Sequence, residues 1–186
     1  MEEMIKKVSR VLKKVKIPYV IIGGIPASIW GKPRMTVDTD IILSIPENKI
    51  DLFLDLLKTE KFKVYPLKKI EKKLKMGLPV KIAYTKHFSI DLRKASYSLD
   101  RKAIERAKNK RIFNISLKIC SREDLIIYKL IRFQEIDIFD IKNVILRWKK
   151  RIDWQYIENS LQEFSKEIGS EEVLLNFEKI KELIRR

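Results

Sequence analysis

The apolar residues of the first 120 positions follow two periods, one helical and one strand-like. Ile5, Val8, Leu12 and Val15 recur at the helical spacing and predict an amphipathic helix over residues 3–15. The lysine-rich piece 68–75 is predicted to be a helix or an excursion from the sheet. Further helices are expected over 25–30 and 47–58, and strands over 17–22, 37–43, 62–65, 80–85, 88–92 and 112–119.

The rest of the chain keeps the helical period throughout. Ser121 and Asp124 have the spacing of a capping box and predict the start of a helix. Three more helices are expected over 138–148, 154–168 and 171–184. We therefore predict an α/β (α+β) fold, with a small mixed sheet flanked by helices in a domain over 1–120 and a helical bundle over 121–186 packed on it.

Length and cysteine content exclude several classes of protein. A chain of 186 residues with a single cysteine, Cys120, has no intrachain disulfide and no paired-cysteine zinc or redox site. The charged N-terminus is unlike a signal peptide, and no apolar run approaches the roughly 20 residues that cross a bilayer. We expect a cytoplasmic protein that does not span a membrane.

The charge is strongly positive and unevenly distributed. The formal net charge is +16, and two short windows carry most of it. Residues 61–75 hold seven lysines against Glu71, a net of +6, and residues 101–122 hold eight basic residues against Glu105, a net of +7. These windows indicate either a surface for a phosphate backbone or solvated faces of a lysine-rich, heat-adapted protein. Charge alone does not decide between these interpretations.

Carboxylates and glycines mark the candidate site. Asp38 and Asp40 share one face of a predicted strand, where they would repel each other unless a cation lay between them. Their oxygens suit a hard ion such as Mg²⁺. Asp91, on a later strand, is either a third ligand or an ordinary outward-facing residue. The pair Gly23-Gly24 follows a strand and offers backbone N–H groups to a phosphate. Together these features indicate nucleotide chemistry.

The order of these motifs resembles a known superfamily. A glycine pair at Gly23-Gly24, the run Arg34-x-Thr36-x-Asp38-x-Asp40, and Asp91 are similar to the pattern of the DNA polymerase β-like nucleotidyltransferases. The Arg-x-Thr-x-Asp-x-Asp run resembles the AbiEii type, which includes many toxins of toxin–antitoxin pairs. The resemblance spans about residues 17–145. It continues in the helical half through Ser121 to Leu125, Lys129, Asp137 and Asp140.

The resemblance implies roles for individual residues. Asp38 and Asp40 would hold Mg²⁺ or Mn²⁺, and Asp91 would help to activate the attacking hydroxyl. The nucleotide would be bound by residues from both halves of the chain, namely Gly23, Gly24, Arg34, Thr36, Lys129, Asp137 and Asp140. Two positions depart from the family pattern. Gly24 stands where serine is common, and Gln134 stands where arginine is common.

Three hypotheses for function follow. The leading one is a metal-dependent transfer of a nucleoside monophosphate from an NTP to an acceptor hydroxyl. The basic windows favour RNA as acceptor, such as the 3′ end of tRNA, and the AbiEii resemblance adds a toxin role with an antitoxin partner. A second hypothesis makes the acceptor a small molecule, such as an aminoglycoside, or a protein hydroxyl. The third is a catalytically silent module that binds nucleic acid.

Overall fold

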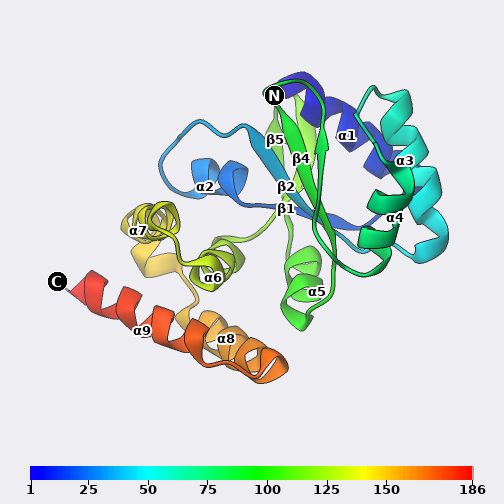
Figure 1. The fold of residues 1–186 in the computed structure, drawn as a ribbon. Helices are drawn as coiled ribbons and strands as arrows, with labels where there is room; N and C mark the ends of the chain where they lie inside the picture. Colours follow the sequence, from blue (N-terminus) through cyan, green and yellow to red (C-terminus); the bar gives the residue numbers. More distant parts are fainter. Residues whose placement is uncertain (186) are drawn as a thin grey trace.

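In the computed structural model, which describes residues 1–185, six strands form one mixed sheet in the order β3-β4-β2-β1-β6-β5 (Figure 1). The strands are β1 (Tyr19–Ile22), β2 (Asp38–Leu43), β3 (Val80–Ala83), β4 (Ser89–Lys94), β5 (Lys108–Ile112) and β6 (Ile115–Ile119). The pairs β2–β4 and β1–β6 are parallel, and the other three pairs are antiparallel. The predicted mixed sheet is confirmed.

The helices divide between the two sides of this sheet. α1, α3 and α4 lie on one side, and α2 gathers with α6 to α9 on the other (Figure 1). Their bounds are α1 (Glu2–Val15), α2 (Gly24–Trp30), α3 (Ile50–Thr59), α4 (Leu67–Lys75), α5 (Ser98–Glu105), α6 (Arg122–Arg132), α7 (Glu135–Trp148), α8 (Trp154–Ile168) and α9 (Glu172–Arg185). Short 3₁₀ turns occupy Glu47–Lys49 and Lys149–Arg151. Through residue 185, none of the helices has the length and apolarity that a membrane span requires.

The apolar stripe of α1 is the part of the core that the sequence predicts most directly. Ile5, Val8 and Leu12 are at most 1% exposed, and Phe53 and Leu57 of α3 are fully buried beside them. α1 and α3 pack against each other on one side of the sheet. Each such side chain contributes about 1.5 to 3 kcal/mol of burial free energy, so this packing fixes the sheet on which the site is built.

Two strand predictions need correction. Residues 62–65 form no strand; among them only Lys63 makes a single bridge, to Ala83. The predicted strand 112–119 is instead part of a hairpin, because Phe113 and Asn114 adopt left-handed backbone conformations with φ of 51° and 61°. Two such residues in succession reverse the chain tightly. The first strand of the hairpin, β5, escapes the prediction because its sequence is almost wholly polar.

Helix boundaries also differ from the prediction. α5 is unpredicted because its eight residues carry no long apolar stripe. It begins where the Asp100 carboxylate accepts hydrogen bonds from the backbone N–H groups of Ser96 and Tyr97. α7 begins at Glu135, three residues before the predicted start at 138, because Asp137 accepts the backbone N–H of Gln134 and caps the helix.

Candidate active site

One row of side chains crosses four strands of the sheet and contains two of the predicted acids. Lys81 of β3 is the register partner of Asp91 of β4, Asp91 is the partner of Asp40 of β2, and Asp40 is the partner of Ile22 of β1. Side chains of register partners lie on the same face of a sheet. Asp38 belongs to the next row, two residues away on the same face. The structure therefore places all three predicted acids on one face of the sheet, and we call Asp38, Asp40 and Asp91 the acidic row.

A lysine and a serine contact these acids. Lys81 Nζ lies 3.1 Å from Asp38 Oδ2 and 3.3 Å from Asp91 Oδ2. Ser89 is the register partner of Asp38, and its hydroxyl donates to Asp38 Oδ1 at 2.5 Å. Asp91 Oδ1 is buried and has no hydrogen-bond partner in the described part of the chain. The Lys81 ammonium is the cation that the two acids share.

Burial and mutual repulsion shift the pKa values of the acids. Burial raises the pKa of Asp40, and the neighbouring charge of Asp91 raises it further. Burial also raises the pKa of Asp91 and outweighs the opposite effect of Lys81. At Asp38 burial is outweighed, because the Ser89 hydroxyl and the Lys81 ammonium lower its pKa below the ordinary value. The raised pKa values mean that the protein stabilises the charged forms of Asp40 and Asp91 less well than water does.

The donor set suits a hard cation. Asp38, Asp40 and Asp91 offer only carboxylate oxygens, the ligands that Mg²⁺ and Mn²⁺ prefer. The unpartnered Asp91 Oδ1 and the ammonium that bridges two of the acids both indicate a position for positive charge. Over residues 1–185, however, no three acidic, histidine or cysteine side chains already converge as a ready metal cage. The binding of Mg²⁺ or Mn²⁺ stays a prediction.

The glycine turn packs directly against the strand that carries the acids. Gly23 has φ of +75°, and a Cβ atom at this position would lie 2.0 Å from Asp40 Oδ2. A Cβ atom at Gly24 lies 2.7 Å from Thr36 Oγ1 when built on the backbone. The Thr36 hydroxyl in turn donates to the carbonyl oxygen of Asp38 at 3.1 Å. Close approach of Thr36 therefore leaves little room for a larger side chain than glycine at position 24.

A buried ionic network joins the α2–β2 loop to the helical half. Lys129 Nζ lies 2.7 Å from Asp137 Oδ1 and 2.8 Å from Asp140 Oδ2. Arg34 makes two hydrogen bonds of 3.0 Å to Asp140, and Arg132 makes two of 2.6 Å to Asp137. Asp137 and Asp140 are buried and are held by these three cations, and Asp137 also accepts the backbone N–H of Gln134. The hydrogen bonds that Arg132 donates to Asp137 raise the pKa of Arg132, whose side chain remains 53% exposed.

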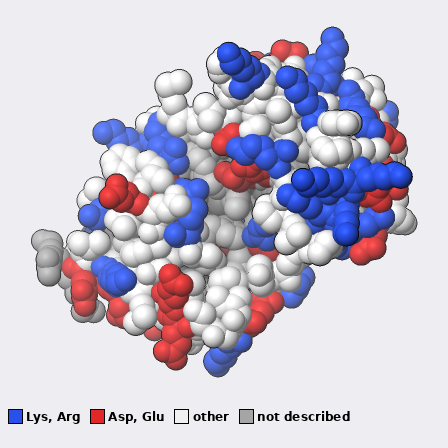
Figure 2. All heavy atoms as spheres, viewed as in Figure 1, with Lys and Arg blue, Asp and Glu red and all other residues white. Residues whose placement is uncertain are grey.

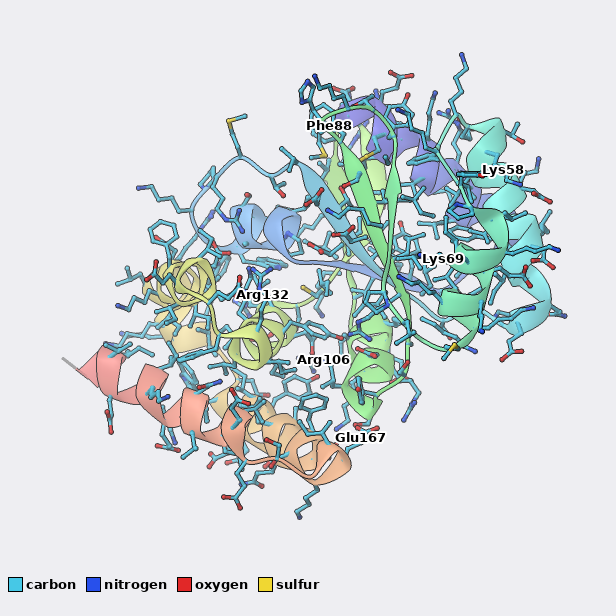
Figure 3. The ribbon with its side chains drawn as sticks, in the orientation of Figure 1. Lys58, Lys69, Phe88, Arg106, Arg132 and Glu167 are labelled. Carbon is cyan, nitrogen blue, oxygen red and sulfur yellow. The ribbon has the colours of Figure 1, made fainter. Side chains whose placement is uncertain are left out.

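Two cavities meet at Asp40. A cavity of about 480 Å³ extends from Asp40 and Asp91 past Lys81 to Lys73 of α4. A smaller one of about 200 Å³ is lined by Asp40 together with Gly23, Lys129, Arg132 and Asp137. Figure 2 shows the hollow between the two halves of the molecule, with acidic atoms beneath basic ones at its centre. Lys69 of α4 and Arg132 of α6 lie on opposite sides of this hollow (Figure 3).

A second ion pair lies on the same face of β4 as Asp91. Arg93, two residues after Asp91 on β4, makes hydrogen bonds of 2.5 and 2.6 Å to the fully buried Asp100 of α5. Tyr128 of α6 donates its hydroxyl to Asp100 at 2.9 Å. Burial alone would raise the pKa of Asp100, but hydrogen bonds from Arg93 and the backbone outweigh it and lower that pKa. These contacts fix β4 relative to α5 and α6.

Four polar residues of the site escaped the prediction. Ser89 and Arg93 flank Asp91 at two-residue spacing on β4, and Arg132 lies one turn beyond Lys129 on α6. That spacing is a signal in the sequence, because residues two apart on a strand or three apart on a helix share a face. Lys81 has no comparable signal. Its position depends on how β3 pairs with β4, and a single sequence does not reveal the pairing.

Comparison with known proteins gives one family and a set of similar structures. The family described as "Nucleotidyltransferase of unknown function (DUF6036)" matches residues 1–185. No relative among the curated proteins matches the sequence.

Three solved structures have a similar fold. The lincosamide antibiotic adenylyltransferase LnuA has a TM-score of 0.51 at 14% identity, over 77% of this chain and 96% of that one. ANT(2″)-Ia, solved with adenylyl-2″-tobramycin, has a TM-score of 0.52 at 12% identity, over 78% and 87%. An antigenic nucleotidyltransferase-like protein from Paracoccidioides brasiliensis has a TM-score of 0.51 at 17% identity, over 89% and 88%.

Proposed function

This chain belongs to the nucleotidyltransferase family DUF6036, and we propose that it transfers a nucleoside monophosphate from an NTP to a hydroxyl group of RNA. The observation that carries the proposal is the position of Asp40. It lies at the junction of an acidic row and two cavities, one of which extends to lysines and the other to the buried ionic network. Such a junction separates a place for the acceptor from a place for the triphosphate.

The acidic row would hold the metal. Asp38, Asp40 and Asp91 are the proposed ligands of Mg²⁺ or Mn²⁺, which would neutralise phosphate charge and lower the pKa of the attacking hydroxyl. Asp91 lies on the side of the row that faces Lys81 and the larger cavity. In the proposal the acceptor hydroxyl therefore approaches from that cavity, and Asp91 orients it.

The smaller cavity is the proposed site of the triphosphate. Two cations of the ionic network, Lys129 and Arg132, line this cavity, and Arg132 is the more exposed of the two. Its guanidinium is therefore the group best placed to bind phosphate oxygens. Lys129 is buried between Asp137 and Asp140 and supplies positive potential from below. Arg34, Thr36, Gly23 and Gly24 fix the turn that borders the cavity. Asp137 and Asp140 orient the cations.

The charge of the larger cavity favours an anionic acceptor. Lys73 and Lys81 line it, and Lys69 and Lys72 are exposed on the same helix as Lys73. Within the described residues none of Lys69, Lys72 and Lys73 forms an ion pair, so their charge is available to phosphates. An aminoglycoside carries several ammonium groups, which these lysines would repel. We therefore keep RNA, including the tRNA 3′ end, as the proposed acceptor.

The second basic window contributes less than its net charge suggests. Three of its basic residues pair with acids, two of them with acids from other elements and Arg122 with its neighbour in α6. Lys102 pairs with Glu163, Arg106 with Glu123 and Asp124, and Arg122 with Glu123. Its remaining charge lies mainly on β5, where Lys108 and Lys110 line a cavity of about 360 Å³ with Trp30. This surface is a secondary binding region in the proposal.

A toxin role, an antitoxin partner and a cytoplasmic location rest on the sequence alone. The toxin role derives from the resemblance to AbiEii-type proteins, and it stays a prediction. Expression of the wild type and of Asp40→Asn in a bacterial host would test it: a toxin arrests growth only when Asp40 is intact. Equal growth of both cultures would refute the toxin role and leave the transfer reaction untouched.

The test of the function is incorporation of label from each of the four NTPs into total RNA with Mg²⁺. We expect transfer by the wild type and by Asp55→Asn, a control that removes an exposed acid from α3. We expect no transfer by Asp40→Asn. Parallel reactions with an aminoglycoside, a lincosamide and a protein extract identify the acceptor class. Label in RNA from none of the NTPs, or equal label with Asp40→Asn, would contradict the proposal.

A further inference from the structure

We propose that the Lys81 ammonium holds Asp38 and Asp91 in place before metal binding, and that a divalent cation must displace this ammonium in order to bind. The inference rests on the proposed function, because it concerns the same carboxylates. It assigns a positioning role to a residue that no motif of the sequence includes. Lys81 would then set how much divalent cation the enzyme needs.

The register of the sheet places Lys81 at this position. It is the partner of Asp91 across β3 and β4, and it also reaches Asp38 on the next strand. The ammonium lies 3.1 Å from one carboxylate oxygen and 3.3 Å from the other. It occupies the point from which a single cation binds both acids, and two cations at that point would repel each other. Lys81 and a bridging metal ion therefore exclude each other.

Lys81 is also able to leave. It lies on β3, at the edge of the sheet, and its side chain is 56% exposed. Ion pairs this exposed contribute little stability, because water competes for both charges. Its four-carbon stem is flexible, and the larger cavity beside it gives the ammonium room to move. The network cation Lys129, by contrast, is buried between two acids and has no such freedom.

A single ammonium leaves the acidic row incompletely compensated. Asp91 Oδ1 is buried without a partner in the part of the chain that is described. Asp40 makes no ion pair there either, although it is the register partner of Asp91. A cation with higher charge at the row would satisfy groups that Lys81 does not reach. The geometry thus favours displacement of Lys81 over permanent occupation of the site.

The test is the affinity of the NTP-free protein for Mn²⁺, measured by electron paramagnetic resonance and by calorimetry. We expect Lys81→Met to bind Mn²⁺ about three- to tenfold more tightly than the wild type, the range for removal of two exposed competing ion pairs. Lys81→Arg, which keeps the charge, should bind like the wild type. Lys73→Met is the matched control, since it removes one charge from the same cavity without removing an ion pair to the acids.

The outcomes separate this inference from the proposed function. Equal Mn²⁺ affinity of Lys81→Met and Lys73→Met, with affinity lost in Asp91→Asn, would overturn the inference and leave the metal site standing. If Asp91→Asn binds Mn²⁺ as the wild type does, both the inference and the metal role of the acids fail. Lys81→Gln repeats the measurement with a polar side chain. A gain in affinity for Lys81→Met and Lys81→Gln alone would support the displacement.

Discussion

A Cβ atom on Gly23 would lie 2.0 Å from the Oδ2 atom of Asp40. Gly23 also has φ of +75° and ψ of −134°, a backbone conformation that is open to glycine and strained for other residues. Gly169, which ends α8, has a similar φ of +67° but no atom within 4 Å of the added Cβ. Substitution of Gly169 therefore tests strain from a positive φ alone, whereas substitution of Gly23 also crowds the acidic row.

Alanine substitution at the two glycines should therefore have different effects on activity. Gly169→Ala should lose about 1 to 2 kcal/mol of unfolding free energy and keep nucleotidyl transfer. Gly23→Ala should lose at least as much stability and also displace Asp40, which reduces transfer by about a hundredfold. Denaturant unfolding and a labelled NTP assay measure the two quantities. Full transfer by Gly23→Ala would show that Asp40 need not hold its present position.

Asp40→Asn should stabilise the protein in the absence of divalent cations while abolishing transfer. The gain, up to about 1 kcal/mol at neutral pH, comes from removal of a repulsive charge beside Asp91. Because burial and Asp91 raise the folded pKa of Asp40, the wild type is more stable when Asp40 is protonated and loses that stability as the pH rises through the folded pKa. The advantage of the variant should therefore vanish in acid.

Thermal unfolding at several pH values, with and without Mg²⁺, tests this prediction. Added Mg²⁺ should raise the Tm of the wild type more than that of Asp40→Asn. Asp55→Asn, on the exposed face of α3, is the control and should respond as the wild type does. An Asp40→Asn protein that is less stable than the wild type at pH 7 would contradict the repulsion.

Asp100→Asn should destabilise the protein strongly at neutral pH. The substitution leaves the partly buried Arg93 without its anionic partner, which costs about 3 kcal/mol. The folded pKa of Asp100 is lowered, so its contribution is present above the ordinary aspartate value of 3.8 and is lost as the pH falls through the lower folded pKa. Urea unfolding at pH 7 and at pH 3 should show a smaller difference from wild type in acid.

Arg132→Gln should weaken NTP binding about tenfold or more, because the variant lacks a charged hydrogen bond to phosphate. Lys129 continues to pair with Asp137 in this variant, so the fold should persist. Arg151→Gln, which removes an exposed guanidinium near Trp148, is the control. Calorimetry with a non-hydrolysable NTP gives both affinities. Unchanged NTP affinity of Arg132→Gln would contradict the proposal that the triphosphate binds in the smaller cavity.

Replacing Lys69, Lys72 and Lys73 together by glutamine should weaken RNA binding and spare NTP binding. Each RNA phosphate that the variant no longer neutralises should reduce the slope of log affinity against log salt by about 0.7. The matched control is the triple glutamine variant at Lys13, Lys14 and Lys16, which are exposed at the end of α1. Fluorescence anisotropy with single-stranded RNA at several salt concentrations measures the slopes. If RNA affinity falls equally in the two triple variants, the loss reflects the change in net charge and not a specific contact of α4 with RNA.

The strand period alone places Asp38 and Asp40 on one face, and this arrangement was predictable from the sequence. The partnership of Asp40 with Asp91 and Lys81 was not, because register across strands depends on packing of the whole sheet. β5 escaped for a related reason. Its polar residues lack the apolar alternation that marks a strand, and its identity comes from pairing with β6.

The bond between Arg34 and Asp140 joins positions 106 residues apart, one beside the sheet and one in the helical half. A division of the gene at residue 120 would leave the acidic row on one fragment and Lys129, Arg132 and Asp140 on the other. Neither fragment could be recombined with a foreign partner unless that partner supplied a matching charge at the same place. A complete site therefore requires two halves whose charges match at this contact.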